Sequence, residues 1–288
     1  MKIADGRKLD WAAYTFQKLR AENSVIQKPL LRLEDGGPGD FDFTIVRIDT
    51  EYYSPRHTHP WPQVRFVLDG VQNFAPGRDL PTGSVSYFPE GTWYGPQQVG
   101  PMTQVLLQFG GPCGMGYPSH AALLKASEEM RKIGKFIKGG AFETVGPDGE
   151  VKRQDGYKAT WEFLKGTPLV YPDPQYDEPI VTRPETFPWQ AVAGTPGNFE
   201  KRLGSFSAGQ VELKMVRAEK GARFVVGAEP RRQLFFLARG ELAGDAGTLG
   251  DHSAIYTEES ERLEFSVTGE IYGMVVTLPS FPPDAATH

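Results

Sequence analysis

Short runs of β-branched and aromatic residues, each ended by Gly or Pro, are the feature that most restricts what this chain folds into. In the first half of the chain the runs are FDFTIVRI (41–48), QVRFVLDG (63–70), SVSYFPEG (84–91) and MTQVLLQFGG (102–111). Such runs are typical of β-strands separated by turns. The 33 glycines and 24 prolines, about a fifth of the 288 residues, also leave little room for long helices. The sequence therefore predicts an all-β protein rather than a helical bundle.

An internal repeat indicates that one β-domain occurs twice. The segments Gln63–Gly70 and Gln233–Gly240 align without gaps at an offset of 170 residues. Both begin with Gln, have Phe at the fourth position and end with Gly. Because each segment lies in the middle of a strand-rich region, we interpret the match as a duplication with an insert between the two copies.

Four parts are expected along the chain. Residues 1–40 should hold a short N-terminal helix, from Asp10 to about Glu22, and a loop. Residues 41–112 should form the first β-domain, and 199–280 the second. Residues 113–198 should contain a helix, a hairpin, a second short helix and a Pro-rich connector. The first of these helices should be capped by Ser119 and continue to Ile137, because apolar residues recur there at helical spacing.

Composition and charge exclude several classes of function. The formal net charge of −5 is opposite in sign to what nucleic acid binding needs. No apolar run is long enough to span a bilayer, and no secretory leader is recognisable, so a cytoplasmic protein without membrane contact is expected. The single cysteine, Cys113, excludes an intrachain disulfide and a cluster of cysteine metal ligands. We expect it to be a buried, unreactive thiol.

The stretch from Glu51 to Gly70, EYYSPRHTHPWPQVRFVLDG, carries the pattern most indicative of chemistry. His57 and His59 are separated by one residue, so on a strand both imidazoles would project from the same face and reach one metal ion. Gln63 and Arg65 continue the same alternation. If it holds, the Arg65 guanidinium points into the interior of the β-domain and needs a carboxylate, from the protein or from a substrate. The alternative is a solvated arginine at the edge of the sheet.

This stretch and the following GSVSYFPEGTWYGPQ resemble the paired motifs of the cupin superfamily, G-x5-H-x-H-x3/4-E-x6-G and G-x5-P-x-G-x2-H-x3-N. The positions that match are His57, His59, Gly70, Gly83, Pro89 and Gly91. The positions that depart from the motifs are Glu51 for the leading Gly, Gln63 for Glu, Tyr94 for His and Gln98 for Asn. The resemblance implies two double-stranded β-helix barrels, jelly-roll-like in architecture, with the helical insert between them.

The same resemblance implies a site in the first barrel only. In the register of the repeat, Gly227, Glu229 and Gln233 take the places of the two His and the Glu in the second copy. That copy has lost the ligand set and should act as a structural partner, packing sheet against sheet. Cupins associate through strand or sheet contacts, which is compatible with a homodimer that the sequence itself does not establish.

The resemblance implies a divalent metal, Fe, Zn, Mn or Ni, held by His57, His59 and Gln63. Metal-binding cupins usually present three His and one Glu, so this set is reduced. Neutral Gln is a weak ligand, which leaves ionised Tyr94, an anionic substrate or Glu51 to complete the set. The alternatives are a metal-free pocket with the histidines as acid and base, and a Gln63 that only orients a histidine through a hydrogen bond.

The remaining expectations concern the pocket and the reaction. Tyr94 and Arg65 are the predicted catalytic residues, with a hydrated aromatic at the barrel mouth as the alternative for Tyr94. The predicted pocket residues are Trp61, Gln98, Gln104 and Gln108, with Trp93 and Phe88 as further aromatic walls. The implied function is a metal-dependent dioxygenase acting on a small organic acid or phenolic compound. The alternatives are a ligand-binding or sensor bicupin without turnover and a metal-free isomerase or epimerase.

Overall fold

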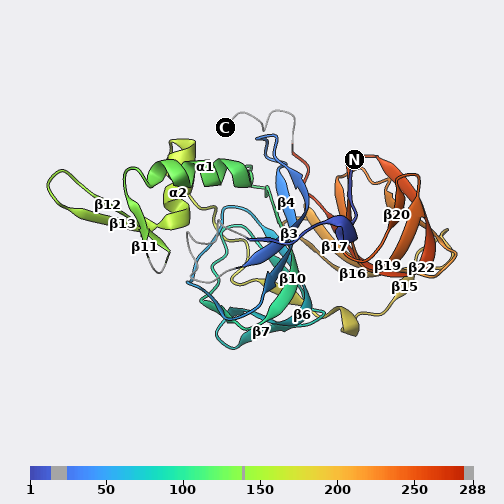
Figure 1. Ribbon diagram of the computed structural model, residues 1–288. Helices are drawn as coiled ribbons and strands as arrows, with labels where there is room; N and C mark the ends of the chain where they lie inside the picture. The colour runs from blue at the N-terminus through green and yellow to red at the C-terminus, as the bar shows by residue number, and fades with distance from the viewer. Residues whose placement is uncertain (14–24, 138–139, 282–288) are drawn as a thin grey trace.

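The expected all-β architecture is present in the computed structural model of the chain, which describes residues 1–13, 25–137 and 140–281. Two large antiparallel sheets each curl into a barrel, and a smaller helical part projects from the side of the first (Figure 1). The N-terminal helix expected over residues 10–22 falls largely outside the described residues. Within that range Ala12–Ala13 form a short strand, β2, and a 3-10 turn, η1 (Gly6–Lys8), precedes it.

The first barrel is built on one sheet that includes both halves of the cupin-like motif pair. Its spatial order is β14 (Ile180–Thr182), β8 (Val85–Phe88), β6 (Gln63–Ala75), β10 (Met102–Phe109), β4 (Phe41–Ile48), β3 (Ile26–Leu33) and β2, with β7 (Arg78–Pro81) paired to β6. A separate two-stranded sheet is formed by β5 (Tyr52–Ser54) and β9 (Gln97–Val99). Residues 34–40 form a loop, as expected, and β3 precedes it in a part of the chain where no strand was expected.

The second barrel has the same kind of sheet. Its spatial order is β1 (Lys2–Ala4), β21 (Ser253–Thr257), β19 (Gln233–Gly244), β22 (Arg262–Thr277), β17 (Val211–Ala218), β16 (Asn198–Phe206) and β15 (Gln190–Ala191), with β18 (Arg223–Gly227) on β22 and β20 (Gly247–Leu249) on β19. The N-terminal strand β1 pairs with β21, so the chain starts in the second barrel and then enters the first. The Pro-rich connector gives one strand to each barrel, β14 and β15, with η3 (Pro184–Thr186) between them.

The insert contains α1 (His120–Met130), a three-stranded sheet of β11 (Lys135–Ile137), β12 (Ala141–Val145) and β13 (Val151–Asp155), and α2 (Gly156–Lys165). Ser119 caps α1 by accepting a hydrogen bond from the Ala122 backbone N–H, as predicted. The expected extension of this helix to Ile137 is wrong. The helix ends at Met130, Ile133 is exposed, and Ile137 lies in β11 opposite Ala141.

The two barrels pack sheet against sheet, as the duplication predicted, through one continuous apolar core. Phe236 of β19 lies with its ring centre 6.1 Å from that of Phe43 and 6.5 Å from that of Phe66. All three side chains are buried. The strands of the first barrel therefore place one face against the second barrel and leave the other face for the barrel interior.

The interiors of the two barrels differ in polarity. In the first, the inward face of β6 carries Gln63 and Arg65, opposite Gln108 and Leu106 of β10. In the second, the position of Arg65 is taken by Phe235, which is fully buried in an apolar cluster with Leu237 and Val275. The second barrel is therefore filled by its own side chains, while the first keeps polar groups in its interior.

No helix within the described parts of the chain is both long enough and apolar enough to cross a membrane.

Candidate functional site

His57 and His59 lie in a loop between β5 and β6 rather than on a strand, but their rings still lie next to each other. Their ring centres are 5.0 Å apart at nearly a right angle. His57 exchanges both backbone hydrogen bonds with Tyr94, at 2.9 and 3.0 Å, and the Gly91 N–H donates to the His59 carbonyl at 2.8 Å. The two motif segments that are separate in sequence are thus joined at the backbone. Gly91 has φ +74°, and a Cβ there would lie 2.2 Å from the Pro172 carbonyl oxygen, which explains the glycine.

Hydrogen bonding fixes the tautomer of neutral His57. Its Nδ1 lies 2.6 Å from the carbonyl oxygen of Pro55, which can only accept, so Nδ1 carries the proton. The lone pair is then on Nε2, where it can take up a proton or bind a metal ion.

Gln63 does not present its carbonyl oxygen to the histidines. Its Oε1 accepts two hydrogen bonds from Arg65, from Nε at 3.1 Å and from Nη2 at 2.7 Å. Its Nε2 donates to Gln108 Oε1 at 3.0 Å, and the Trp61 indole N–H donates to the same oxygen at 3.3 Å. Gln108 in turn donates to the Tyr117 hydroxyl. The predicted residues Gln63, Trp61 and Gln108 therefore form one buried network, but Gln63 is held by a guanidinium.

Arg65 places a positive charge in the interior of the first barrel. Its side chain points inward, as the alternation predicted, and the residue is only 5% exposed. The guanidinium carbon lies 3.9 Å from the ring centre of Phe88, and Nη2 donates to the Tyr94 hydroxyl at 3.2 Å. Burial lowers the pKa of Arg65, and the neighbouring tyrosines Tyr94 and Tyr52 act in the opposite direction. The ion pairs of the described residues include none to Arg65.

Tyr94 is buried and packed between these groups. Its ring centre lies 4.4 Å from that of His57 and 4.8 Å from that of Phe88. A hydrated position at the barrel mouth, the alternative considered from the sequence, does not describe it. Its hydroxyl oxygen accepts a hydrogen bond from Arg65 Nη2, which holds the hydroxyl in a fixed position.

A small internal cavity of about 50 Å³ lies beside Arg65. Gln104 of β10 lines it, as predicted, together with Gln72 of β6 and Gln97 of β9. The prediction for Gln98 is wrong. Its side chain is exposed, because the alternation along β9 buries Gln97 and Val99 and turns Gln98 outward.

Sequence reasoning missed Gln72, and the reason is a β-bulge. Val67 pairs with Gln104 and Asp69 pairs with Thr103, so Leu68 has no opposite residue. Such an extra residue reverses the alternation. Even-numbered positions therefore face inward beyond it, and nothing in the residue pattern marks this change.

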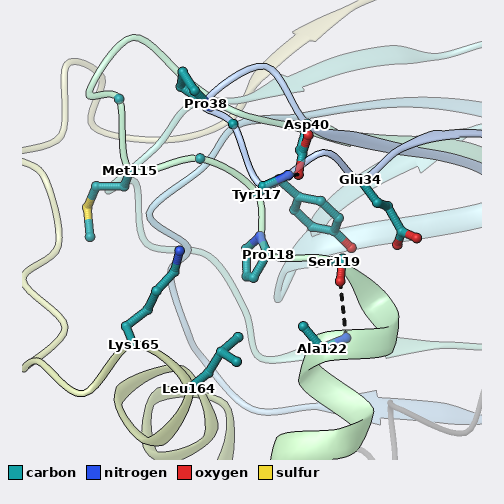
Figure 2. Close-up of a pocket in the computed structure, with 14 residues that line it drawn as sticks. Glu34, Pro38, Asp40, Met115, Tyr117, Pro118, Ser119, Ala122, Leu164 and Lys165 are labelled. Atoms are coloured by element: carbon teal, nitrogen blue, oxygen red, sulfur yellow. Dashed lines mark hydrogen bonds between the residues drawn. The ribbon is translucent and has the colours of Figure 1, made fainter. Parts of the chain in front are cut away.

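A second pocket, of about 240 Å³, lies between the loops at 34–40 and 114–119 and the ends of α1 and α2 (Figure 2). Tyr117 connects it to the network through Gln108. None of the predicted site residues is among the described residues that line it.

Glu90 and Cys113 are hydrogen-bonded to each other, and Cys113 also contacts the loop that carries the two histidines. Glu90 is 3% exposed and accepts a hydrogen bond from the Cys113 backbone N–H at 3.1 Å, while Cys113 Sγ donates to the Pro60 carbonyl at 3.3 Å. Burial raises the pKa of Glu90. Cys113 was expected to be buried, but the residue is exposed. Partial desolvation of Sγ, followed by the charge of Glu90, raises the pKa of its thiol to about 12.

The raised pKa of Glu90 predicts a pH-dependent effect of Glu90→Gln. The folded state binds the Glu90 proton more tightly than the unfolded state does, so the wild type loses stability as the pH rises from the ordinary carboxyl range through the raised pKa. We expect Glu90→Gln to be more stable than the wild type at pH 8, by about 1–3 kcal/mol, with a smaller difference at pH 4. Urea unfolding across this range measures the difference, with exposed Glu219→Gln as the control. A variant that is less stable at pH 8 would contradict this account of Glu90.

The donor set does not fit a divalent metal held by four protein ligands. His57 and His59 are present, but both lone pairs of the Gln63 oxygen face Arg65 and the Tyr94 hydroxyl also accepts from it. No group of three His, Cys, Asp or Glu within the described residues is arranged to hold a metal ion. A buried guanidinium beside the site also opposes a second positive charge.

Comparisons with known proteins give structural neighbours only. No protein-family model matches the chain, and no curated protein matches its sequence. A putative dioxygenase from Nostoc punctiforme is similar over 98% of this chain and 87% of its own, with a TM-score of 0.60 and 12% identity. Oxalate decarboxylase from Bacillus subtilis is similar over 97% and 76%, with a TM-score of 0.54 and 11% identity. A nickel(II) complex of a bacterial pirin from Escherichia coli is similar over 97% and 99%, with a TM-score of 0.52 and 10% identity.

At these identities the likeness establishes the fold. The paired motif segments meet at one barrel, and the repeat corresponds to two barrels packed sheet against sheet. The chain therefore has the two-barrel fold of the cupin superfamily.

Proposed function

We propose that the first barrel binds a small organic acid with its carboxylate against Arg65. The observation that carries this proposal is a buried guanidinium that pairs with no carboxylate in the described part of the chain. Burying an unpaired charge is costly, and a ligand carboxylate would remove that cost. Arginine suits this role because its planar fork matches a carboxylate.

The guanidinium has donors left for such a ligand. Nε and Nη2 are used by Gln63 and Tyr94, whereas Nη1 makes no hydrogen bond to any described residue. Arg65 also borders the internal cavity. Arg65 therefore has N–H groups that no described residue uses and lies at the wall of a cavity that could hold a ligand.

His57 and Tyr94 supply a proton-transfer pair next to Arg65, which Tyr94 contacts through its hydroxyl, although neither is among the described residues that line the cavity. Nε2 of neutral His57 is a base, and the Tyr94 hydroxyl, held by Arg65, is a donor. Their rings are in contact at 4.4 Å. The activity that this arrangement supports best is a metal-free proton transfer on the bound acid, as in an isomerase or epimerase. The same site without turnover would be a binding or sensor protein.

A metal-dependent dioxygenase is the second candidate. It is favoured by the Nε2 lone pair of His57 and by the His59 ring 5.0 Å away, which could provide two ligands. The neighbours described as a putative dioxygenase and as a nickel(II) complex point the same way. The homodimer and the cytoplasmic location expected from the sequence remain predictions.

Metal analysis and chelation separate the two candidates. Protein purified without a chelating column should contain little metal, and His57→Ala should not change its content. Turnover on a panel of small keto and hydroxy acids should survive chelation and be lost in Tyr94→Phe, while Tyr53→Phe, an exposed tyrosine, should keep it. Stoichiometric metal lost in His57→Ala, together with oxygen-dependent turnover, would overturn the metal-free proposal. Binding of acids without any turnover would assign the sensor function.

A further inference from the structure

The internal cavity beside Arg65 combines donors and acceptors that lack partners. The amide oxygens of Gln72 and Gln104 are buried and accept no hydrogen bond from any described residue. Gln72 is 2% exposed and Gln104 is 5% exposed. Both residues border the same cavity as Arg65, whose Nη1 donates to no described residue. A buried acceptor without a partner is costly, so these oxygens favour an occupant that donates.

Resting on the proposed acid site, we propose that its ligand is a small hydroxy acid, with its hydroxyl in this cavity as a donor to Gln104 or Gln72. The carboxylate would accept from Arg65 Nη1, and the hydroxyl would satisfy an amide oxygen. The remaining wall consists of Tyr52, Gln97 and apolar side chains such as Val46, Val99 and Leu106. A compact ligand with one carboxylate and one hydroxyl fits this distribution of charged, polar and apolar groups.

The charge of the cavity selects a hydroxyl over an ammonium group. Arg65 is the one charged side chain among the described residues that border the cavity. An ammonium group would add a second buried cation next to the guanidinium, with only neutral amide oxygens to stabilise it. A hydroxyl donates equally well without that charge.

The size of the cavity limits the ligand. A volume of about 50 Å³ corresponds to roughly three to five water-sized groups, at about 10–15 Å³ for each. Glycolate, with five non-hydrogen atoms, fits this volume, and lactate, with six, is at about its upper limit, whereas a phenolic ring is excluded from the cavity itself.

Calorimetric titration of the full chain with matched ligands tests this inference. The probes are lactate, propionate without the hydroxyl, alanine with an ammonium group in its place, and methyl lactate without the carboxylate. Lactate should bind about tenfold more tightly than propionate, as expected for one hydrogen bond to a buried acceptor. Alanine and methyl lactate should bind more weakly still.

Two variants connect the hydroxyl effect to the cavity. Gln104→Leu, alone or with Gln72→Leu, should bring lactate and propionate to nearly equal affinity. Without ligand its Tm should not fall, because it removes a buried acceptor that lacks a partner. Gln98→Leu, on an exposed neighbouring strand position, should keep the tenfold preference.

The outcomes distinguish this inference from the function on which it rests. Equal affinity for lactate and propionate in the wild type, or a preference that survives Gln104→Leu and Gln72→Leu together, would overturn the hydroxy-acid assignment while leaving the acid site intact. Failure of every carboxylate to bind would instead overturn the acid site.

Discussion

Arg65→Gln is expected to lower the affinity for small carboxylates by about 10- to 100-fold. This is the range for removing a charge-assisted hydrogen bond, about 1.5–3 kcal/mol. The substitution also removes the only charged group that faces the internal cavity among its described lining residues. Isothermal titration calorimetry with a two- or three-carbon acid measures the change directly.

The same variant should remain folded. Replacing Arg65 removes a buried cation that only neutral groups and aromatic faces contact. Thermal unfolding of the variant should therefore show no large drop in Tm. Arg262→Gln, at an exposed arginine of the second barrel, is the matched control and should bind as the wild type does. Unchanged carboxylate affinity in Arg65→Gln would contradict the role given to this residue.

Phe236→Ala should produce the largest loss of stability, about 3–5 kcal/mol. Phe236 is fully buried and packs against Phe43 and Phe66 across the contact between the barrels. The cavity left behind would weaken the core that both sheets share. Chemical denaturation followed by fluorescence and circular dichroism measures the free energy of unfolding.

Because the core is continuous, the two barrels of this variant should still unfold together, with the two signals changing at the same denaturant concentration. Phe163→Ala, at an exposed position of α2, should change stability little. A loss below about 1 kcal/mol in Phe236→Ala, outside the range for buried phenylalanine, would show that the barrels do not depend on this contact.

The alternation of residues along strands correctly predicted which side chains of β10, and of β6 up to its bulge, face inward. Gln63, Arg65, Gln104 and Gln108 all face the interior of the first barrel, since β6 and β10 pair regularly across these positions. The loss of the ligand set in the second copy also agrees with its apolar interior, where Phe235 takes the place of Arg65. Periodicity worked where a strand is long and both its faces are buried.

The errors have physical causes that a residue pattern does not contain. The alternation reverses at Leu68 because of the bulge, which brought Gln72 inward. In the short strand β9 the inward phase is set by its pairing with β5, which turned Gln98 outward. The apolar spacing that suggested a longer α1 continues by coincidence into Ile137, whose strand pairing ends the resemblance to a helix.

The sequence also did not predict the hydrogen-bond partners of the residues at the ligand positions of the motif. Gln63 occupies the expected motif position, but whether its oxygen faces a metal or a guanidinium depends on the conformation of Arg65 two residues later. Likewise, β1 pairs with β21 at the other end of the chain. Such long-range pairing follows from tertiary packing rather than from local composition.

We propose that Arg65, rather than a bound metal ion, provides the positive charge of the first barrel. Calorimetric titration of chelator-treated wild-type protein with lactate, beside Arg65→Gln under the same conditions, tests it most directly. We expect saturable binding to the metal-free wild type at one site per chain and a loss of affinity of about 10- to 100-fold in the variant. Binding that appears only after a divalent metal is restored, or that persists unchanged in Arg65→Gln, would contradict it.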